Sequence, residues 1–205
     1  MSKSAGNSPL KLFVLFVILV IAVVWLVSGY KKTNFIPQNP SILIKPVATP
    51  TVNPDREVHS PDGKMKIVMK ISNQSDGSKL YSFYVSALSG ENQKLLFSKT
   101  VENGSMTLPL NSFSPDDKYV FLREDDSNSF TFLVFKANGD SFSDGQNYLD
   151  VATLFIQKKV QYVFKDVTGW DDPTLLHVTT STGNTKGPSF WFDIDSRSFI
   201  QLATR

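Results

Sequence analysis

Two histidines, His59 and His177, are the only imidazole groups in this 205-residue chain, and cysteine is absent. A Ser-His-Asp hydrolase would need one of them as its base, yet no Gly-x-Ser-x-Gly elbow occurs. We expect His177 to be a structural histidine in a strand and His59 to be solvated in a turn. The lack of cysteine excludes disulfides, thiolate metal sites and a cysteine nucleophile. No catalytic residue is therefore predicted.

One loop carries residue types that bind calcium, namely Asp140, Asp144 and Asn147 together with Gly145. Phe142, however, stands where an EF-hand loop needs an oxygen ligand. Ordinary turn formation explains these residues, because Asp, Asn and Gly favour turns for their own reasons. We therefore predict no metal site.

Paired carboxylates occur at Asp171 and Asp172, the side chains that glycoside hydrolysis uses. They would serve only if a further acid lay roughly 5–10 Å away. No glycine-rich phosphate loop has the required spacing. The sequence thus predicts no cofactor, and a hydrolase-type enzyme remains an alternative reading.

Four residues are predicted as a possible interaction surface: Trp191, Glu124, Asp125 and Asp126. Trp191 alternates with two phenylalanines in its strand, which places it on the opposite face. Interfaces are enriched in such aromatic residues. We expect the three acids to lie in a solvated turn over residues 123–128, where they would offer an acidic docking patch.

The charge is unevenly distributed along the chain, whose net charge is +2. Before residue 57 six basic residues face one acid, so that part carries +5 and the remainder −3. A mildly acidic body disfavours nucleic acid as a partner, because that affinity comes from clustered Lys and Arg.

A membrane helix is predicted over residues 10–30, behind a short tail of residues 1–9. The segment is apolar apart from Lys11, is long enough for a bilayer core, and ends with Trp25, Tyr30 and Lys31-Lys32. A signal peptide cleaved near residues 27–29 is the alternative. We expect a signal anchor with the large C-terminal part extracytoplasmic.

Residues 31–57 are predicted to form a proline-rich linker. An extended spacer of this kind would hold the body up to roughly 80 Å from the bilayer. Within it, the apolar residues 42–44 are expected to form an edge strand or to dock on the body.

The chain contains a repeated turn that leads directly into an apolar strand. It reads Ser114-Pro115-Asp116-Asp117 before Tyr119–Leu122, and Ser60-Pro61-Asp62-Gly63 before a strand from Met65. Proline and aspartate are the residues that such turns favour. A modified third copy covers residues 170–173.

Residues 58–205 are predicted to be one β domain with units over about 58–105, 106–147 and 160–203. The first two turns are 54 residues apart, and each is followed by a hairpin signal. A period of this size with several strands per unit indicates propeller blades. Residues 148–156 are an insertion between the second and third units whose type the sequence leaves open, although Leu149, Ala152 and Ile156 have a spacing that a short helix could use.

These turn-and-strand copies resemble the Pro-Asp repeat of TolB-type β-propellers. The resemblance implies an all-β, antiparallel fold and extracytoplasmic protein binding or scaffolding, and it implies no catalytic residue. Propellers close with 4–8 blades, whereas this chain supplies about three. We expect that a homo-oligomer completes the ring, that a protein partner caps the stack, or that the units form a sandwich.

The sequence therefore predicts a single-pass, membrane-anchored, non-catalytic domain that binds a protein partner or itself. A ligand-sensing or regulatory ectodomain is the first alternative.

Overall fold

The computed structural model describes residues 55–203. All of these residues belong to one compact unit. The predicted tail, the membrane helix at 10–30 and nearly all of the linker lie outside the described residues. Within residues 55–203, no helix has the length and apolarity to cross a membrane.

The first sheet has four antiparallel strands in chain order: β1 (Arg56–His59), β2 (Met65–Asn73), β3 (Lys79–Ala87) and β4 (Lys94–Val101). Arg56 and Glu57 pair with β2, so the sheet begins two residues earlier than the linker boundary predicted. His59 is the last residue of β1, not a turn residue. Its ring contacts the Glu57 carboxylate at 3.1 Å and remains exposed, as expected.

The second sheet is again antiparallel and in chain order: β5 (Gly104–Thr107), β6 (Tyr119–Asp126), β7 (Phe130–Lys136) and β8 (Leu149–Asp150). The acids predicted to form a turn are the last residues of β6. They are held in the strand because β5 pairs with them, with Gly104 opposite Asp126 and Met106 opposite Glu124. The turn itself is confined to the few residues before Phe130.

A short helix, α2 (Val151–Gln157), follows β8 within the insertion whose apolar residues have helical spacing. Asp150 caps it, and the Oδ1 atom of Asp150 accepts the backbone N–H of Thr153 at 2.9 Å. Phe155 of this helix is buried, whereas Ile156 is 71% exposed.

The third sheet contains β9 (Val163–Asp172), β10 (Leu175–Thr182), β11 (Thr185–Lys186), β12 (Phe190–Asp193) and β13 (Ser198–Gln201). Its order is β11-β10-β12-β13, with β9 also paired to β10. Trp170 to Asp172, predicted as a turn, belong to β9. Strand β9 continues to Asp172 because it stays paired with β10, although the register shifts at three points. Only Pro173 and Thr174 are left to turn the chain.

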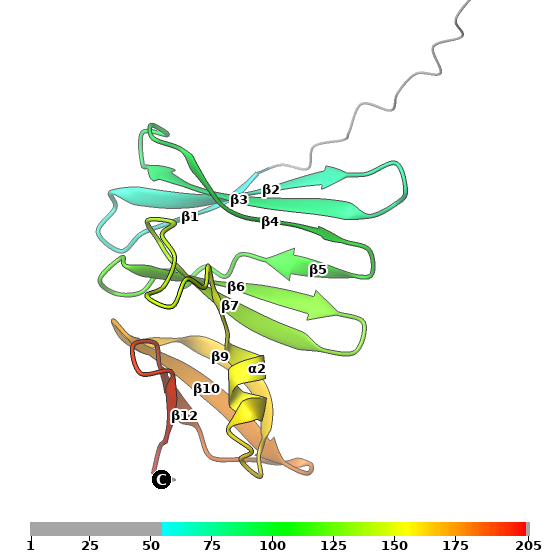
Figure 1. Cartoon of the computed structure of the whole chain (residues 1–205), viewed down its shortest axis with the longest axis vertical. Coiled ribbons are helices and arrows are strands. Elements are labelled where there is room, and N and C mark those ends of the chain that lie inside the picture. Colours follow the sequence, from blue (N-terminus) through cyan, green and yellow to red (C-terminus); the bar gives the residue numbers. More distant parts are fainter. Residues whose placement is uncertain (1–54, 204–205) are drawn as a thin grey trace, which may run out of the picture. The chain divides into compact units, whose positions relative to one another are not determined.

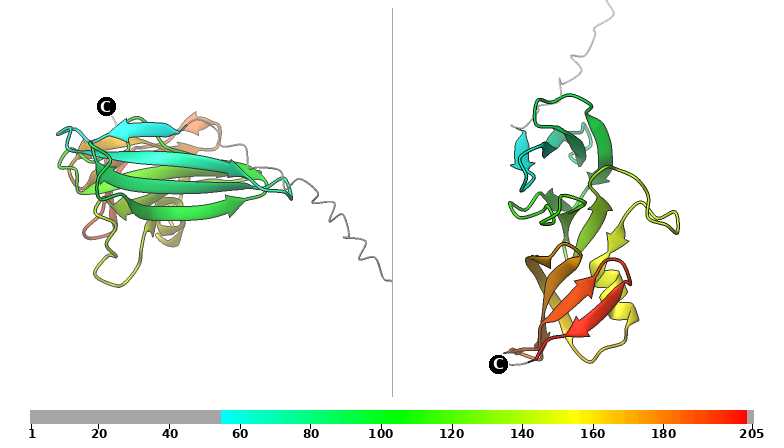
Figure 2. Two further views of the ribbon diagram at one scale, coloured as in Figure 1. Left: turned by 90° about the horizontal axis from the view of Figure 1, so that it is seen from above. Right: turned by 90° about the vertical axis from the view of Figure 1, so that its left-hand side faces the viewer.

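The three sheets follow one another in chain order, with the second between the other two (Figures 1 and 2). Val120 and Leu122 of β6 belong to the core shared with the first sheet, whereas Phe121 belongs to the core shared with the third sheet and α2. A strand buried on both faces explains the continuous apolar run that the sequence shows at this point.

The outer face of the first sheet carries lysines beside the apolar residues Val68, Tyr84 and Leu95, which pair across β2, β3 and β4. Lys66 lies on this outer face because it alternates along β2 with the buried residues Ile67 and Met69. Its Nζ atom is 3.0 Å from Glu57 Oε2. Lys70 lies over the ring of Tyr84 at 5.5 Å. The prediction of a mostly β, antiparallel protein is confirmed. The described residues form an open series of sheets and no closed ring.

Candidate binding groove

The two Ser-Pro-Asp turns have the same hydrogen bonds. Ser60 Oγ donates to Asp62 Oδ1 at 2.8 Å and accepts the backbone N–H of Met65 at 3.0 Å. Ser114 Oγ makes the equivalent bonds to Asp116 and Tyr119 at the same distances. Both serines are buried. These side chains therefore stabilise the turns that lead into β2 and β6.

The fourth position of each turn has a left-handed backbone. Gly63 adopts φ 70° at no steric cost, and Asp117 adopts φ 62° at the matching position. Desolvation raises the pKa of Asp117, and the nearby negative charge of Asp62 raises it further. The two turns therefore lie close together, although they belong to different sheets.

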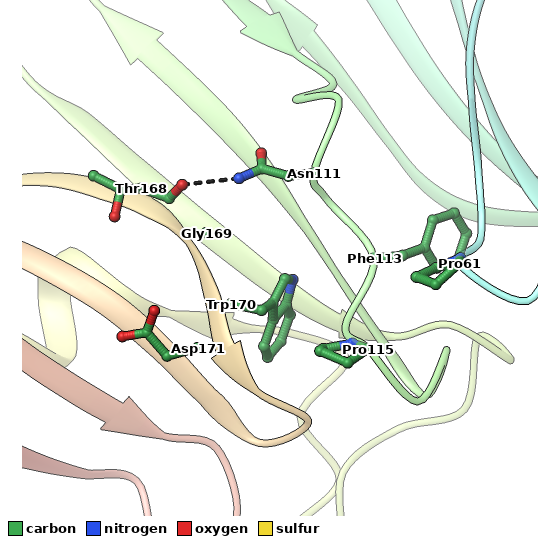
Figure 3. A pocket seen from close by; sticks show the side chains of 8 residues that line it. All are labelled: Pro61, Asn111, Phe113, Pro115, Thr168, Gly169, Trp170 and Asp171. Carbon is green, nitrogen blue, oxygen red and sulfur yellow. Dashed lines mark hydrogen bonds between the residues drawn. The ribbon is translucent and has the colours of Figure 1, made fainter.

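A cavity of about 350 Å³ lies beside these turns (Figure 3). It is lined by Pro61, Asn111, Phe113, Pro115, Thr168, Gly169, Trp170 and Asp171. The β1–β2 turn, the loop between β5 and β6, and strand β9 each contribute residues. We call this cavity the inner groove. Residues from all three sheets therefore meet at one site.

Strand β9 is held tightly against the loop before β6. Asn111 Nδ2 donates to the carbonyl of Thr168 at 2.8 Å, and Trp170 Nε1 donates to the carbonyl of Ser112 at 3.0 Å. Gly169 makes this approach possible, because a Cβ there would lie 2.4 Å from Asn111 Nδ2. Its φ of 140° also favours glycine.

Trp170 forms an aromatic wall of the groove and stacks on Tyr119, with ring centroids 6.2 Å apart. The Tyr119 hydroxyl donates to Asp195 at 3.1 Å. Burial, helped by this hydrogen bond, raises the pKa of Tyr119 to about 12. Tyr119 is therefore a neutral donor at physiological pH that ties the second sheet to the third.

Asp171 connects the groove to the outer face of the third sheet. Its Oδ2 atom accepts Trp191 Nε1 at 2.7 Å and lies 3.2 Å from His177 Nδ1. His177 is in β10, as predicted, and its Nε2 atom is buried without a partner in residues 55–203. A second cavity, of about 700 Å³, lies beside this histidine.

Trp191 lies on the face expected from alternation, because its neighbours Phe190 and Phe192 are buried while it is half exposed. Within the described chain, no hydrogen bond or ion pair connects Trp191 with the acids of β6.

The acids of β6 are largely neutralised by neighbours. Glu124 forms an ion pair with Lys99 of β4, and Asp125 forms one with Arg123 at 2.7 Å. Asp126 is exposed, and its carboxylate accepts the backbone N–H of Ser127 at 2.7 Å. The pairing with Lys99 joins the first sheet to the second.

The loop considered for calcium uses its side chains in other ways. Arg197 donates to Asp144 at 2.6 Å, and this bond lowers the pKa of Asp144 to about 2. Asp140 contacts Lys94 at 3.5 Å, and Asn147 accepts the hydroxyl of Ser141. No cluster of His, Asp or Glu suited to a metal ion occurs in residues 55–203.

Several groove residues carried little signal in the sequence. Asn111 and Thr168 are ordinary loop and strand residues, and only their long-range contact makes them part of the site. Gly169 had a usable signal, because an isolated glycine within a strand marks a bulge or a close approach of backbone.

Together these features define a mostly β protein built from antiparallel sheets that meet at one groove. No family model and no curated protein matches the sequence. Among solved structures, the chain is similar in part to TolB from Acinetobacter baumannii, at 15% identity and a TM-score of 0.39. The match covers 76% of this chain and 33% of that protein, so this chain spans about a third of its length.

Proposed function

We propose that this chain is a single-pass, membrane-anchored, extracytoplasmic binding domain of the propeller type. In this proposal residues 10–30 form the anchor, and the domain binds a protein partner without catalysis. The anchor is supported by the apolar sequence with its aromatic and lysine ends. The propeller type is supported by three successive antiparallel sheets and by the Ser-Pro-Asp turns.

The inner groove is the observation that carries the binding function. Its walls are the rings of Trp170, Pro61 and Pro115, which suit an apolar side chain, and Asp171 offers a carboxylate. Aromatic anchors with few polar groups are typical of recognition sites. Leu110, the chain neighbour of the groove residue Asn111, is 78% exposed. The groove fits an extended protein segment that carries an apolar residue next to Lys or Arg.

The open series of sheets favours a separate partner over a ring made from copies of this chain. Ring closure would bury the outer face of the first sheet, where Lys66 and Lys70 lie. Burying such charges is costly. An outer face that carries these lysines is instead suited to the terminal unit of a stack.

Filling the groove tests the proposal. Thr168 is exposed on β9 and lines the groove, so Thr168→Arg places a long cation next to Asp171. The full chain would carry a photo-crosslinking residue at position 110 in its native membrane. We expect a discrete protein adduct that Thr168→Arg abolishes.

Thr100→Arg is the matched control, because Thr100 is exposed on β4 and does not line the groove. It should leave the adduct unchanged. An adduct that survives Thr168→Arg, or one that both variants remove equally, would refute the assignment of the groove.

A further inference from the structure

The segment that joins α2 to β9 exposes apolar and basic side chains together. Ile156 is 71% exposed and Val163 is 55% exposed. Lys158, Lys159 and Lys165 are exposed between and beside them. We call these five residues the lysine patch.

The patch is held in place by a packed base. The rings of Phe155 and Phe164, the neighbours of Ile156 and Val163, lie 5.8 Å apart, so the end of α2 is fixed to the start of β9. Tyr162 packs on Phe190 with ring centroids 5.9 Å apart. The exposed side chains therefore lie at the end of α2, in the loop after it and at the start of β9, and Figure 1 shows this loop below α2.

The charge of the patch is opposite to that of the domain around it. Residues 156–165 contain three lysines and no acid, whereas residues 57–205 carry a net charge of −3. Within residues 55–203, none of these lysines forms an ion pair, although most other basic side chains do. Three cations next to exposed Ile156 and Val163 complement an anionic surface with an apolar interior.

We propose that the lysine patch docks on the headgroups of an anionic lipid bilayer. Ile156 and Val163 enter the boundary between headgroups and acyl chains, and the lysines contact lipid phosphates. This inference rests on the proposed membrane anchor, which keeps the domain next to a bilayer. A lipid surface fits better than a protein groove, because the apolar residues are few and the cations have no defined acceptor geometry.

The test uses the full chain reconstituted in nanodiscs. Because the chain has no cysteine, Gln161→Cys allows one environment-sensitive dye to be placed within the patch. We expect its emission to shift to shorter wavelength in phosphatidylglycerol–phosphatidylcholine discs and to stay unshifted in pure phosphatidylcholine discs. High salt should reverse the shift, since it screens the lysines.

Charge reversal tests whether the lysine patch itself, and not the overall charge of the domain, causes the docking. The triple variant Lys158→Glu, Lys159→Glu and Lys165→Glu should weaken docking roughly 100-fold, as expected from the loss of three lysine–lipid contacts. The control reverses Lys79, Lys136 and Lys186, which also lack an ion pair within residues 55–203, and it should retain the shift.

Two failures can be told apart. If the full chain does not associate with pure phosphatidylcholine discs, the anchor is wrong and so is the proposed function. If it associates, but the dye at position 161 responds no more than a dye at Ser75→Cys in the β2–β3 turn, the lysine patch is not a lipid site. A shift that the control variant removes equally would also overturn the inference.

Discussion

Replacing Gly169 by alanine should loosen the attachment of β9 to the rest of the domain. The new Cβ would lie 2.4 Å from Asn111 Nδ2 and 3.5 Å from its Cγ. The contact is with the end of a side chain, so Asn111 can rotate away. In doing so it loses its 2.8 Å hydrogen bond to the carbonyl of Thr168.

The cost has a backbone part and a hydrogen-bond part. Holding alanine at the φ of 140° costs about 1–3 kcal/mol. The lost hydrogen bond costs about 1 kcal/mol, and the lower entropy of the unfolded alanine chain returns about 0.4–1 kcal/mol. We therefore expect Gly169→Ala to lower the free energy of unfolding by about 1–3.5 kcal/mol.

The assay is urea unfolding of the full chain, followed by far-UV circular dichroism, in a double-mutant cycle with Asn111→Ala. In the Asn111→Ala background, Gly169→Ala should cost about 1 kcal/mol less, because no side chain remains to be displaced. Gly183→Ala is the control. Gly183 has φ 56° and open space around its Cβ, so only the backbone part applies. Equal costs of Gly169→Ala in both backgrounds would refute this account of the groove.

Two further predictions concern charged turns. Asp117→Gly should raise the free energy of unfolding by about 1 kcal/mol at neutral pH, because glycine fits the left-handed backbone and the repulsion from Asp62 disappears. Asp117→Asn should retain only the electrostatic gain, and urea unfolding that shows no gain for either variant would contradict this. For Asp144, Arg197 lowers the folded-state pKa from the usual 3.8 to about 2, so the ion pair stabilises the fold above pH 3.8 and its contribution is lost as the pH falls through about 2. The difference in unfolding midpoint between wild type and Asp144→Asn should accordingly shrink over that range, and a pH-independent difference would exclude this linkage.

Sequence reasoning located the regular strands well where a strand is buried. Alternation placed Trp191 and its two phenylalanine neighbours on opposite faces, and the structure confirms this. The apolar run from Tyr119 to Leu122 was predicted as a strand and is one. Both signals are local, since the side-chain direction of a strand alternates with a period of two.

The errors occurred where a partner strand overrides local composition. Acids of β6 have the composition of a turn, yet pairing with β5 keeps them in the strand. Asp171 and Asp172 likewise extend β9 because β10 lies beside them.

The sequence alone determined the mostly β class, the chemistry of the Ser-Pro-Asp turns and the uneven distribution of charge. These depend on residues close together in the chain, so their physics can be read locally. The inner groove exists only in the tertiary structure, because it brings together Pro61, Asn111 and Trp170 from segments about fifty or more residues apart. Such a site depends on how the sheets pack, and packing is governed by long-range contacts that local patterns do not encode.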